Sequence, residues 1–353
     1  MNDVTLGSQA KFELSARSKL IWRSIQTVFW FVGLSMILAL IIVPRIGLHA
    51  FWNVLIPVAP ALLVVATGLW RNVCPMASTA LFPMHLQFSR EKRLSIATQG
   101  RLHVVGVTLL LLLVPLRHVI LDTNGLATAG VIIILAICAF ILGANYKWKS
   151  AWCSGICPIH PVEKLYGSRS AFELPNAHCV SCHQCTIPCP DSTPSMHPLA
   201  HTGTPFHHMA GIVMIGAFPG FIWGWFHVPD YQGMEGWNHL DLAYGLPLIG
   251  AIISLILFIG LLRWGLVKNV ERQFLFFATI AVSCYYWYRL PALLGFGLFP
   301  GDGMLVDLSN ILPHWFPIAS RLVTTSFFIW WLLIRNSDRR SWSIRPPFKL
   351  AES

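Results

Sequence analysis

Residues 126–145 read LATAGVIIILAICAFILGAN and carry no charged side chain. A helix of about 20 such residues, rising about 1.5 Å per residue, spans the hydrocarbon core of a bilayer. Comparable apolar runs recur along the rest of the chain, at 22–43, 50–70, 102–121, 209–228, 242–266, 274–295 and 318–334. Inside lipid, only helices and closed barrels satisfy their own backbone hydrogen bonds. The sequence therefore predicts an all-α polytopic membrane protein with about eight transmembrane helices.

The composition agrees with a membrane protein and excludes a soluble enzyme. Of the 353 residues, 55% are hydrophobic and 11% are charged, whereas soluble domains carry about 25% charged residues. The apolar run that starts at residue 22 is too long for a signal peptide, so we expect it to remain as the first helix. The chain has neither a G-x-G-x-x-G fingerprint nor a Walker A loop, and we expect no built-in NADH or ATP site.

The basic residues predict how the spans are oriented. With eight spans, both termini and the loops 71–101 and 146–208 share one side, which carries all but four of the 25 Lys and Arg residues. Loops rich in Lys and Arg stay in the cytoplasm. We therefore predict a multi-pass protein of the prokaryotic cytoplasmic (inner) membrane, with its termini and both loops inside. The net charge of +10 follows from this topology, so we expect no nucleic-acid partner.

A dense cysteine run lies in the second of these loops. It reads Cys179-Val-Ser-Cys182-His-Gln-Cys185-Thr-Ile-Pro-Cys189-Pro190. This C-x2-C-x2-C-x3-C-P spacing is typical of bacterial ferredoxins, in which three thiolates bind one [4Fe-4S] cluster and the fourth serves another. Zinc sites usually separate their cysteine pairs by a dozen or more residues. The string Cys179 to His183 also matches a c-type haem attachment signal, but that interpretation requires the outer face and leaves Cys185 and Cys189 unexplained.

Three more cysteines lie on the same predicted side, at the ends of spans: Cys74, Cys153 and Cys157. Cys74-Pro75 and Cys157-Pro158 follow the second and fourth spans, which suggests two duplicated helical hairpins. Seven thiolates serve one cluster, or two if a histidine such as His160 or His178 supplies an eighth ligand. In the two-cluster hypothesis, the first three cysteines of the run share a cluster with Cys157 or Cys74. The second then takes Cys189, Cys153 and the remaining thiolate.

These motifs resemble the NapH/NosR-type membrane polyferredoxins, which include the CcoG-like and MauN-like proteins. Trp152-Cys153-Ser-Gly-Ile-Cys157-Pro158 is similar to the family's membrane-edge C-x3-C-P signature, and the resemblance covers about residues 20–195. It implies a [4Fe-4S] electron carrier between the quinol pool, or a cytoplasmic donor, and a respiratory or maturation partner. Two departures matter: Trp70 replaces a leading cysteine, and one ferredoxin run stands where typical members have two.

The predicted organisation is one membrane domain with an inserted iron–sulfur loop. Its parts are a cytoplasmic segment 1–21, a four-helix part 22–145 with the Cys-Pro loop at 71–101, the iron–sulfur loop 146–208, four further helices in 209–334 and a tail 335–353. We expect an electron-transfer component of an oxidoreductase system that is surrounded by lipid and contacts other redox subunits. An accessory reductase or maturation factor, and a structural subunit of a larger complex, are the alternatives.

Histidines and carboxylates at the span ends suggest further ligands. His103 and His118 bracket the third span, and His208 (or His207) and His227 bracket the fifth. Ionisable residues at these depths are candidates for haem b ligands, although histidines also anchor helix ends at the interface. A quinone is a second candidate ligand. Its proton acceptors would come from the outer loops, whose polar residues are equally typical of helix caps. These residues are Asp122, Asp230, Glu235, His239, Asp302, Asp307 and His314. The basic cytoplasmic face would suit an acidic electron-carrier protein.

Overall fold

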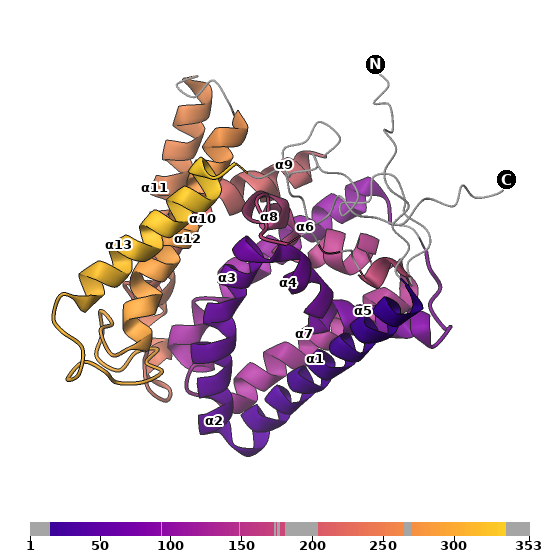
Figure 1. Cartoon of the computed structure of the whole chain (residues 1–353), viewed down its shortest axis with the longest axis horizontal. Coiled ribbons are helices and arrows are strands. Elements are labelled where there is room, and N and C mark those ends of the chain that lie inside the picture. Colours follow the sequence, from indigo (N-terminus) through magenta and orange to yellow (C-terminus); the bar gives the residue numbers. More distant parts are fainter. Residues whose placement is uncertain are drawn as a thin grey trace.

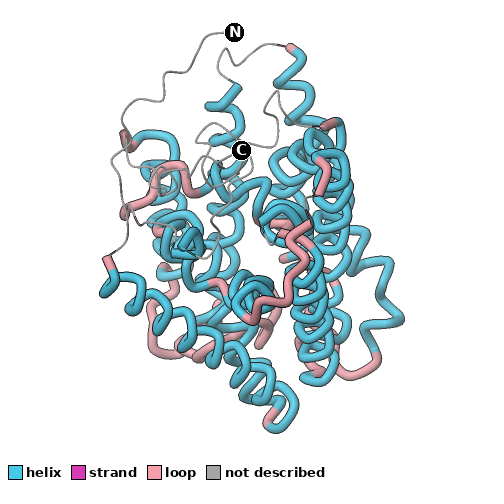
Figure 2. The backbone as a smooth tube through the Cα atoms, turned by 90° about the vertical axis from the view of Figure 1, so that its right-hand side faces the viewer, coloured by secondary structure: helices cyan, strands magenta, loops and turns pink. Residues whose placement is uncertain are grey.

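The computed structural model describes residues 15–92, 94–147, 149–172, 174, 177–180, 204–264 and 270–336. Within these ranges the chain is helical, and its β-structure is limited to one isolated bridge between Lys92 and Tyr146. The elements, in chain order, are α1 (Ala16–Ile42), α2 (Pro44–Leu48), η1 (His49–Leu55), α3 (Ile56–Val65), α4 (Thr67–Val73), α5 (Pro75–His85), α6 (Ile96–Leu113), η2 (Arg117–Leu121), α7 (Gly125–Asn145), η3 (Lys149–Ile156), α8 (His160–Tyr166), η4 (Ala177–Val180), α9 (Pro205–Ile212), η5 (Val213–Ala217), α10 (Phe218–Trp225), η6 (Glu235–His239), α11 (Leu240–Arg263), α12 (Val270–Leu293), α13 (Phe316–Ile329) and η7 (Trp330–Ile334). Figure 2 shows the helical bundle from the side. The predicted all-α class is confirmed.

Seven helical stretches are long and apolar enough to cross a membrane. They are Ala16–Ile42, Pro44–Val65, Ile96–Leu113, Gly125–Asn145, Pro205–Trp225, Glu235–Arg263 and Phe316–Ile334. Each overlaps a predicted span. The second stretch ends at Val65, before the predicted residue 70, because Ala66 leaves helical geometry (φ −139°, ψ 56°). The chain is therefore a multi-pass membrane protein in its described part.

The remaining predicted span, 274–295, forms α12 but is not among these seven stretches. Its polar residues, Gln273 and Arg289 among them, make it less apolar than the others. In α12, 13 of the 24 residues are buried, whereas in α1 only Leu40 is buried. A helix enclosed by other helices needs fewer apolar residues than one that faces lipid, because neighbouring side chains satisfy its polar groups.

The two halves of the chain lie side by side. Figure 1 shows α10 to α13 grouped on one side, α1, α2, α5 and α7 on the other, and α3 between them. Two hydrogen bonds join α3 to the group of α10 to α13 and the adjoining η7: the Tyr286 hydroxyl donates to the Pro57 carbonyl (2.6 Å) and the Trp331 indole donates to the Val64 carbonyl (3.3 Å). The unassigned helices of residues 209–334 thus pack directly on the half that carries the family resemblance.

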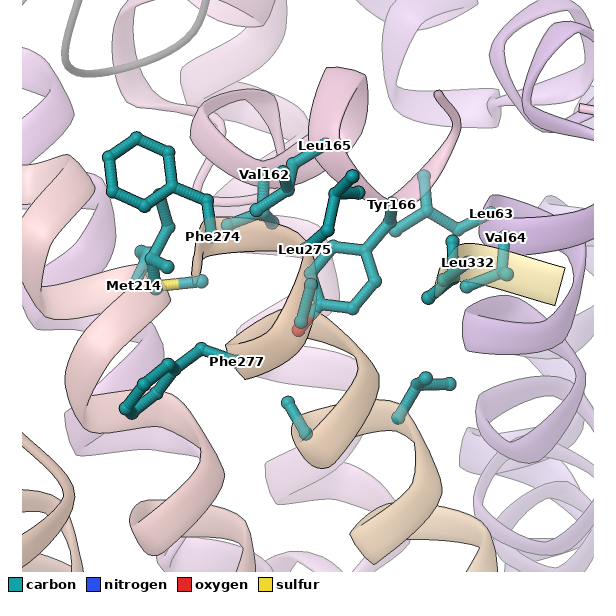
Figure 3. Packing of buried hydrophobic residues seen from close by; sticks show 14 of the residues in the cluster. Leu63, Val64, Val162, Leu165, Tyr166, Met214, Phe274, Leu275, Phe277 and Leu332 are labelled. Atoms are coloured by element: carbon teal, nitrogen blue, oxygen red, sulfur yellow. The ribbon is translucent and has the colours of Figure 1, made fainter. Parts of the chain in front are cut away.

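The main hydrophobic core lies where the two halves meet. It combines residues from α3, α8, η5, α12 and η7, including Leu63, Val162, Tyr166, Met214 and Leu332. Figure 3 shows Tyr166 among the side chains of this cluster, which the two halves supply together. The short helix α8, which follows Cys157-Pro158, is therefore anchored on both halves.

Close backbone contact fixes α5 against α7, and Gly143 makes this contact possible. A Cβ atom at Gly143 would lie 1.9 Å from the carbonyl oxygen of Ala80. Ala139, one turn earlier, is fully buried in the same interface. Small residues four apart are the usual device for close helix packing in membranes.

We expect Gly143→Ala to destabilise the protein by about 1–3 kcal/mol, because the added methyl group must push the two helices apart. Gly130→Ala on the same helix is the matched control, since nothing lies within 4 Å of its Cβ position. Thermal unfolding in detergent micelles compares the two variants. Equal midpoints for Gly143→Ala and Gly130→Ala would show that α5 and α7 do not touch in this way.

Candidate functional site

Cys74 lies at a break between two short helices. Helix α4 ends at Val73, Cys74 is extended (φ −60°, ψ 114°), and Pro75 is the first residue of α5. Proline suits this first helical position because it has no N–H to leave unpaired. The half-buried thiol packs against a small apolar cluster that contains Trp152, and Cys153 packs against the same cluster. Burial raises the pKa of the Cys74 thiol, so the uncomplexed side chain is a thiol rather than a thiolate.

Cys153 and Cys157 lie at a second, similar break. Cys153 belongs to η3, Cys157 follows its last residue, and Pro158 precedes α8. Helix α6 comes very close to this segment, because a Cβ atom at Gly106 would lie 1.9 Å from the carbonyl oxygen of Ile156. Both Cys-Pro pairs therefore occupy the point where one helical segment stops and another begins, as the proposed duplication would require.

A buried ion pair links the two breaks. Arg71 Nε donates to Glu163 Oε1 at 2.9 Å, and the two side chains are 9% and 12% exposed. Arg71 stands three residues before Cys74, and Glu163 stands six residues after Cys157. The pair holds α4 against α8, and the close fit of Gly167 against Thr67 supports the same contact.

The start of the ferredoxin-type run is attached to the same segment of α4. The Ala177 amide donates to Asn72 Oδ1 at 2.9 Å, and His178 Nε2 donates to the Arg71 carbonyl oxygen at 3.1 Å. Asn72 and His178 are almost completely buried. Since Cys179 is the next residue along the chain, these bonds bring the backbone at the start of the run beside the segment that leads to Cys74.

The remaining ligands of the predicted clusters are described only in part. Cys182, Cys185 and Cys189 lie outside the described residues, and of Cys179 the backbone alone is described. Among the residues that are described, no three His, Cys, Asp or Glu side chains lie close enough together to hold a metal ion. His178 uses Nε2 as a donor to Arg71, so that nitrogen fixes the chain here. The assignment of seven thiolates and a histidine stays a prediction.

The predicted haem histidines have other neighbours. The rings of His103 and His207 meet edge to face, with centroids 5.3 Å apart. His118 bonds to Asp230. The His227 ring packs against the Trp223 ring, with centroids 4.4 Å apart, and against the Tyr288 ring. His208 follows His207 in the sequence and is half-buried. The haem b interpretation therefore remains a prediction from the sequence.

A second polar site lies at the opposite end of the helices. The sequence analysis considered its histidine and its carboxylates separately and did not predict that they form one site with arginines. We call it the Arg117 cluster; it contains Arg117, His118, Asp122, Asp230, Arg289 and Asp302. Arg117 bonds Asp122 Oδ1 at 3.2 Å and Asp230 Oδ2 at 3.1 Å. His118 Nδ1 bonds Asp230 Oδ1 at 2.5 Å. The Asp230 amide donates to Asp302 Oδ2 at 2.7 Å.

Burial and mutual contacts set the protonation states in this cluster. Burial raises the pKa of Asp122 to about 6 despite Arg117, and Asp230 adds to the increase. Burial also raises the pKa of Asp302 to about 6. Burial opposes the charge on Asp230 as well, but Arg117 and His118 outweigh it and hold the pKa of Asp230 well below its usual range. Burial lowers the pKa of His118, so this ring is neutral.

One signal in the sequence could have revealed this cluster. The predicted outer side has only four Arg residues, and two of them, Arg117 and Arg289, belong to it. A charged residue at the end of an apolar span is expensive unless it is paired. Asp122 and Asp230 are the charged partners of Arg117, whereas Arg289 donates to the Trp52 carbonyl and to Asn53 Oδ1.

Comparisons of the chain with protein-family models, curated proteins and solved structures find no match.

Proposed function

We propose that this chain is a membrane-integral [4Fe-4S] electron-transfer protein that links the quinone pool or a cytoplasmic donor to a respiratory redox partner. One observation carries the proposal: the residues just before the ferredoxin-type run are hydrogen-bonded to the residues just before Cys74. A cysteine run of this spacing needs a further thiolate from elsewhere in the chain for a complete ligand set. Cys74-Pro75 follows the segment to which the residues before the run are hydrogen-bonded, and we infer that Cys74 supplies this thiolate.

The donor set suits an iron–sulfur cluster better than other metals. Thiolates at C-x2-C-x2-C-x3-C-P spacing match the corners of a cubane, and the two Cys-Pro thiolates come from rigid helix breaks. A bound cluster would accept and release single electrons. The chain's own part is to hold the ligand segments together through Arg71 and Glu163 and to keep water out with the apolar residues around Cys74 and Cys153.

Anaerobically purified protein should test this proposal directly. We expect a broad visible absorption that bleaches with dithionite, a low-temperature EPR signal of a reduced cluster, and iron with acid-labile sulfide near four or eight per chain. Zinc without sulfide, or a protein with no metal after anaerobic purification, would overturn the proposal. The sulfide value also decides between one cluster and two.

A pair of cysteine variants assigns the signal to the run. Cys185→Ser should lose at least one cluster, with iron and sulfide falling by about half if two are present and to near zero if one is. Cys284→Ser is the matched control, because Cys284 packs against the apolar core inside α12. The assignment fails if both variants keep the full signal or both lose it.

A further inference from the structure

We propose that the Arg117 cluster is a proton-binding site whose carboxyl groups exchange one proton with the aqueous phase at the end of the molecule opposite the cysteines. The inference does not depend on the iron–sulfur proposal, because every residue in it lies away from Cys74, Cys153 and Cys157. Four separate connections of the chain build the site: η2 with the turn after it, the segment after α10, the end of α12, and the segment before α13.

The charges of the cluster do not balance. Two guanidinium groups, Arg117 and Arg289, face three carboxylates, and the His118 ring bonds Asp230 through Nδ1. With a neutral histidine the fully ionised cluster has a net charge of −1. A buried site stabilises an uncompensated charge poorly. Binding one proton makes the cluster neutral.

The geometry shows where that proton would reside. Asp122 and Asp230 flank the same Arg117 guanidinium, at 3.2 and 3.1 Å. Two carboxyl groups held this close share a proton more readily than they both ionise. Asp230 also bonds His118 and sits against Arg117, so it is the one that stays ionised. The proton therefore belongs to Asp122 or, on the other side of Asp230, to Asp302.

A small cavity gives the cluster access to water. Its volume is about 30 Å³, and its walls include His118, Asp230, Arg289 and Asp302. That volume holds about one water molecule. His118 and Arg289 are 4% and 2% exposed, yet His118 Nε2 and Arg289 Nε have no hydrogen-bond partner within the described part of the chain. A water molecule would satisfy both: Arg289 Nε donates to it, and it donates to His118 Nε2.

The cavity also reaches toward the surface. Leu298, which forms part of its wall, is 48% exposed. The other polar groups that face the cluster are Tyr288 on the cavity wall, Tyr285 near Arg117, and Asn53, which accepts from Arg289 and contacts His49. Tyrosine stays protonated near neutral pH, asparagine does not titrate, and His49 is exposed and bonds Asn53. The exchangeable proton is therefore carried by the aspartates.

Infrared difference spectroscopy of the full-length protein in micelles tests this site. Between about pH 8 and about pH 4, we expect the wild type to gain a carboxylic acid C=O band with a midpoint near 6, the range to which Asp122 and Asp302 are shifted. Labelling with ¹³C-aspartate should shift this band and assign it to aspartate without any substitution. No aspartate band above the ordinary range of exposed carboxyl groups would overturn the proposal.

Variants then place the proton within the cluster. Asp122→Asn and Asp302→Asn each remove one negative charge, so each should abolish the band or move its midpoint down to the ordinary range for aspartate. Asp307→Asn is the matched control, since this exposed carboxylate accepts hydrogen bonds from Ser309 and, within the described residues, is not part of the Arg117 cluster. A band that survives both cluster substitutions unchanged would place the proton elsewhere and refute the site. The iron and acid-labile sulfide per chain, which report the iron–sulfur content, should be the same in all of these variants.

Discussion

Replacing Arg71 by leucine is expected to destabilise the folded protein by about 3–5 kcal/mol, because it leaves the buried Glu163 carboxylate without its guanidinium partner. The two side chains meet at 2.9 Å and are 9% and 12% exposed. This is far from the situation of a surface ion pair, which contributes about 0–1 kcal/mol. Chemical unfolding in detergent micelles measures the change.

A matched variant separates the loss of the pair from the loss of any basic residue. Arg90→Leu removes an exposed arginine and should change the stability little. The double variant Arg71→Leu with Glu163→Leu should recover much of the lost stability, since apolar residues often replace a buried ion pair without penalty. A double variant as unstable as Arg71→Leu alone would mean that the pair is not what holds α4 against α8.

Arg71→Leu should also lower the metal content of the protein. Arg71 accepts the bond from His178 through its carbonyl oxygen, and its side chain fixes α4 to α8. If the ligand segments are displaced, iron and sulfide per chain should fall together with stability. Arg71→Lys keeps the charge but lacks the planar fork of arginine, so we expect an intermediate value for both quantities.

Asp230→Asn is expected to have a comparable effect at the opposite end of the molecule, about 3–5 kcal/mol. Asp230 bonds both Arg117 and His118, and its side chain is 4% exposed. Asparagine keeps the shape but removes the charge, so the buried Arg117 guanidinium retains Asp122 as its only charged partner within the described residues. Unfolding in micelles, compared with the wild type, gives the size of the loss.

Two further variants show whether the effect is electrostatic. Glu235→Gln neutralises an exposed carboxylate next to the same end of the helices and should leave stability unchanged. Arg117→Met keeps a long side chain against the Trp52 and Trp225 rings, which lie 5.5 and 5.2 Å from the guanidinium carbon. The double variant Arg117→Met with Asp230→Asn should lose less free energy of unfolding than the two single variants lose together. Strict additivity would show that the two side chains are not coupled.

The spans were predictable because lipid imposes a length and a composition on them. Seven of the eight predicted runs form stretches that are long and apolar enough to cross a membrane. The exception, α12, was predicted as a span but is shielded by other helices, so its sequence is freer to carry Gln273 and Arg289. A hydropathy pattern reports what faces lipid, and it says little about a helix enclosed by protein.

The cysteine spacing predicts a type of metal site but not where in the fold its ligand segments meet. Cysteine spacing indicates a cubane because the spacing itself reflects the distances between cluster corners. Which other segment approaches the run depends on contacts between residues about 100 positions apart, such as Asn72 with Ala177. No local pattern in the sequence encodes such a pairing.

The Arg117 cluster was missed for the same reason. In the sequence, His118 resembles a haem ligand and Asp122, Asp230 and Asp302 resemble helix caps, because each was considered with its own chain neighbours. The bond from Arg117 to Asp230 joins residues that are 113 positions apart. Only the packed structure brings three carboxylates to two arginines.

By itself, the sequence determined the all-α membrane class of this protein and the approximate positions of its spans, and it predicts a cysteine-ligated metal site. These properties follow from apolar length and local spacing, which act between residues close together in the chain. The tertiary structure decided that the Cys74 and Cys157 segments are linked by Arg71 and Glu163, and that the opposite end contains a buried, unbalanced ionic cluster. Both depend on which helices pack together, and that choice is made by contacts across the whole chain.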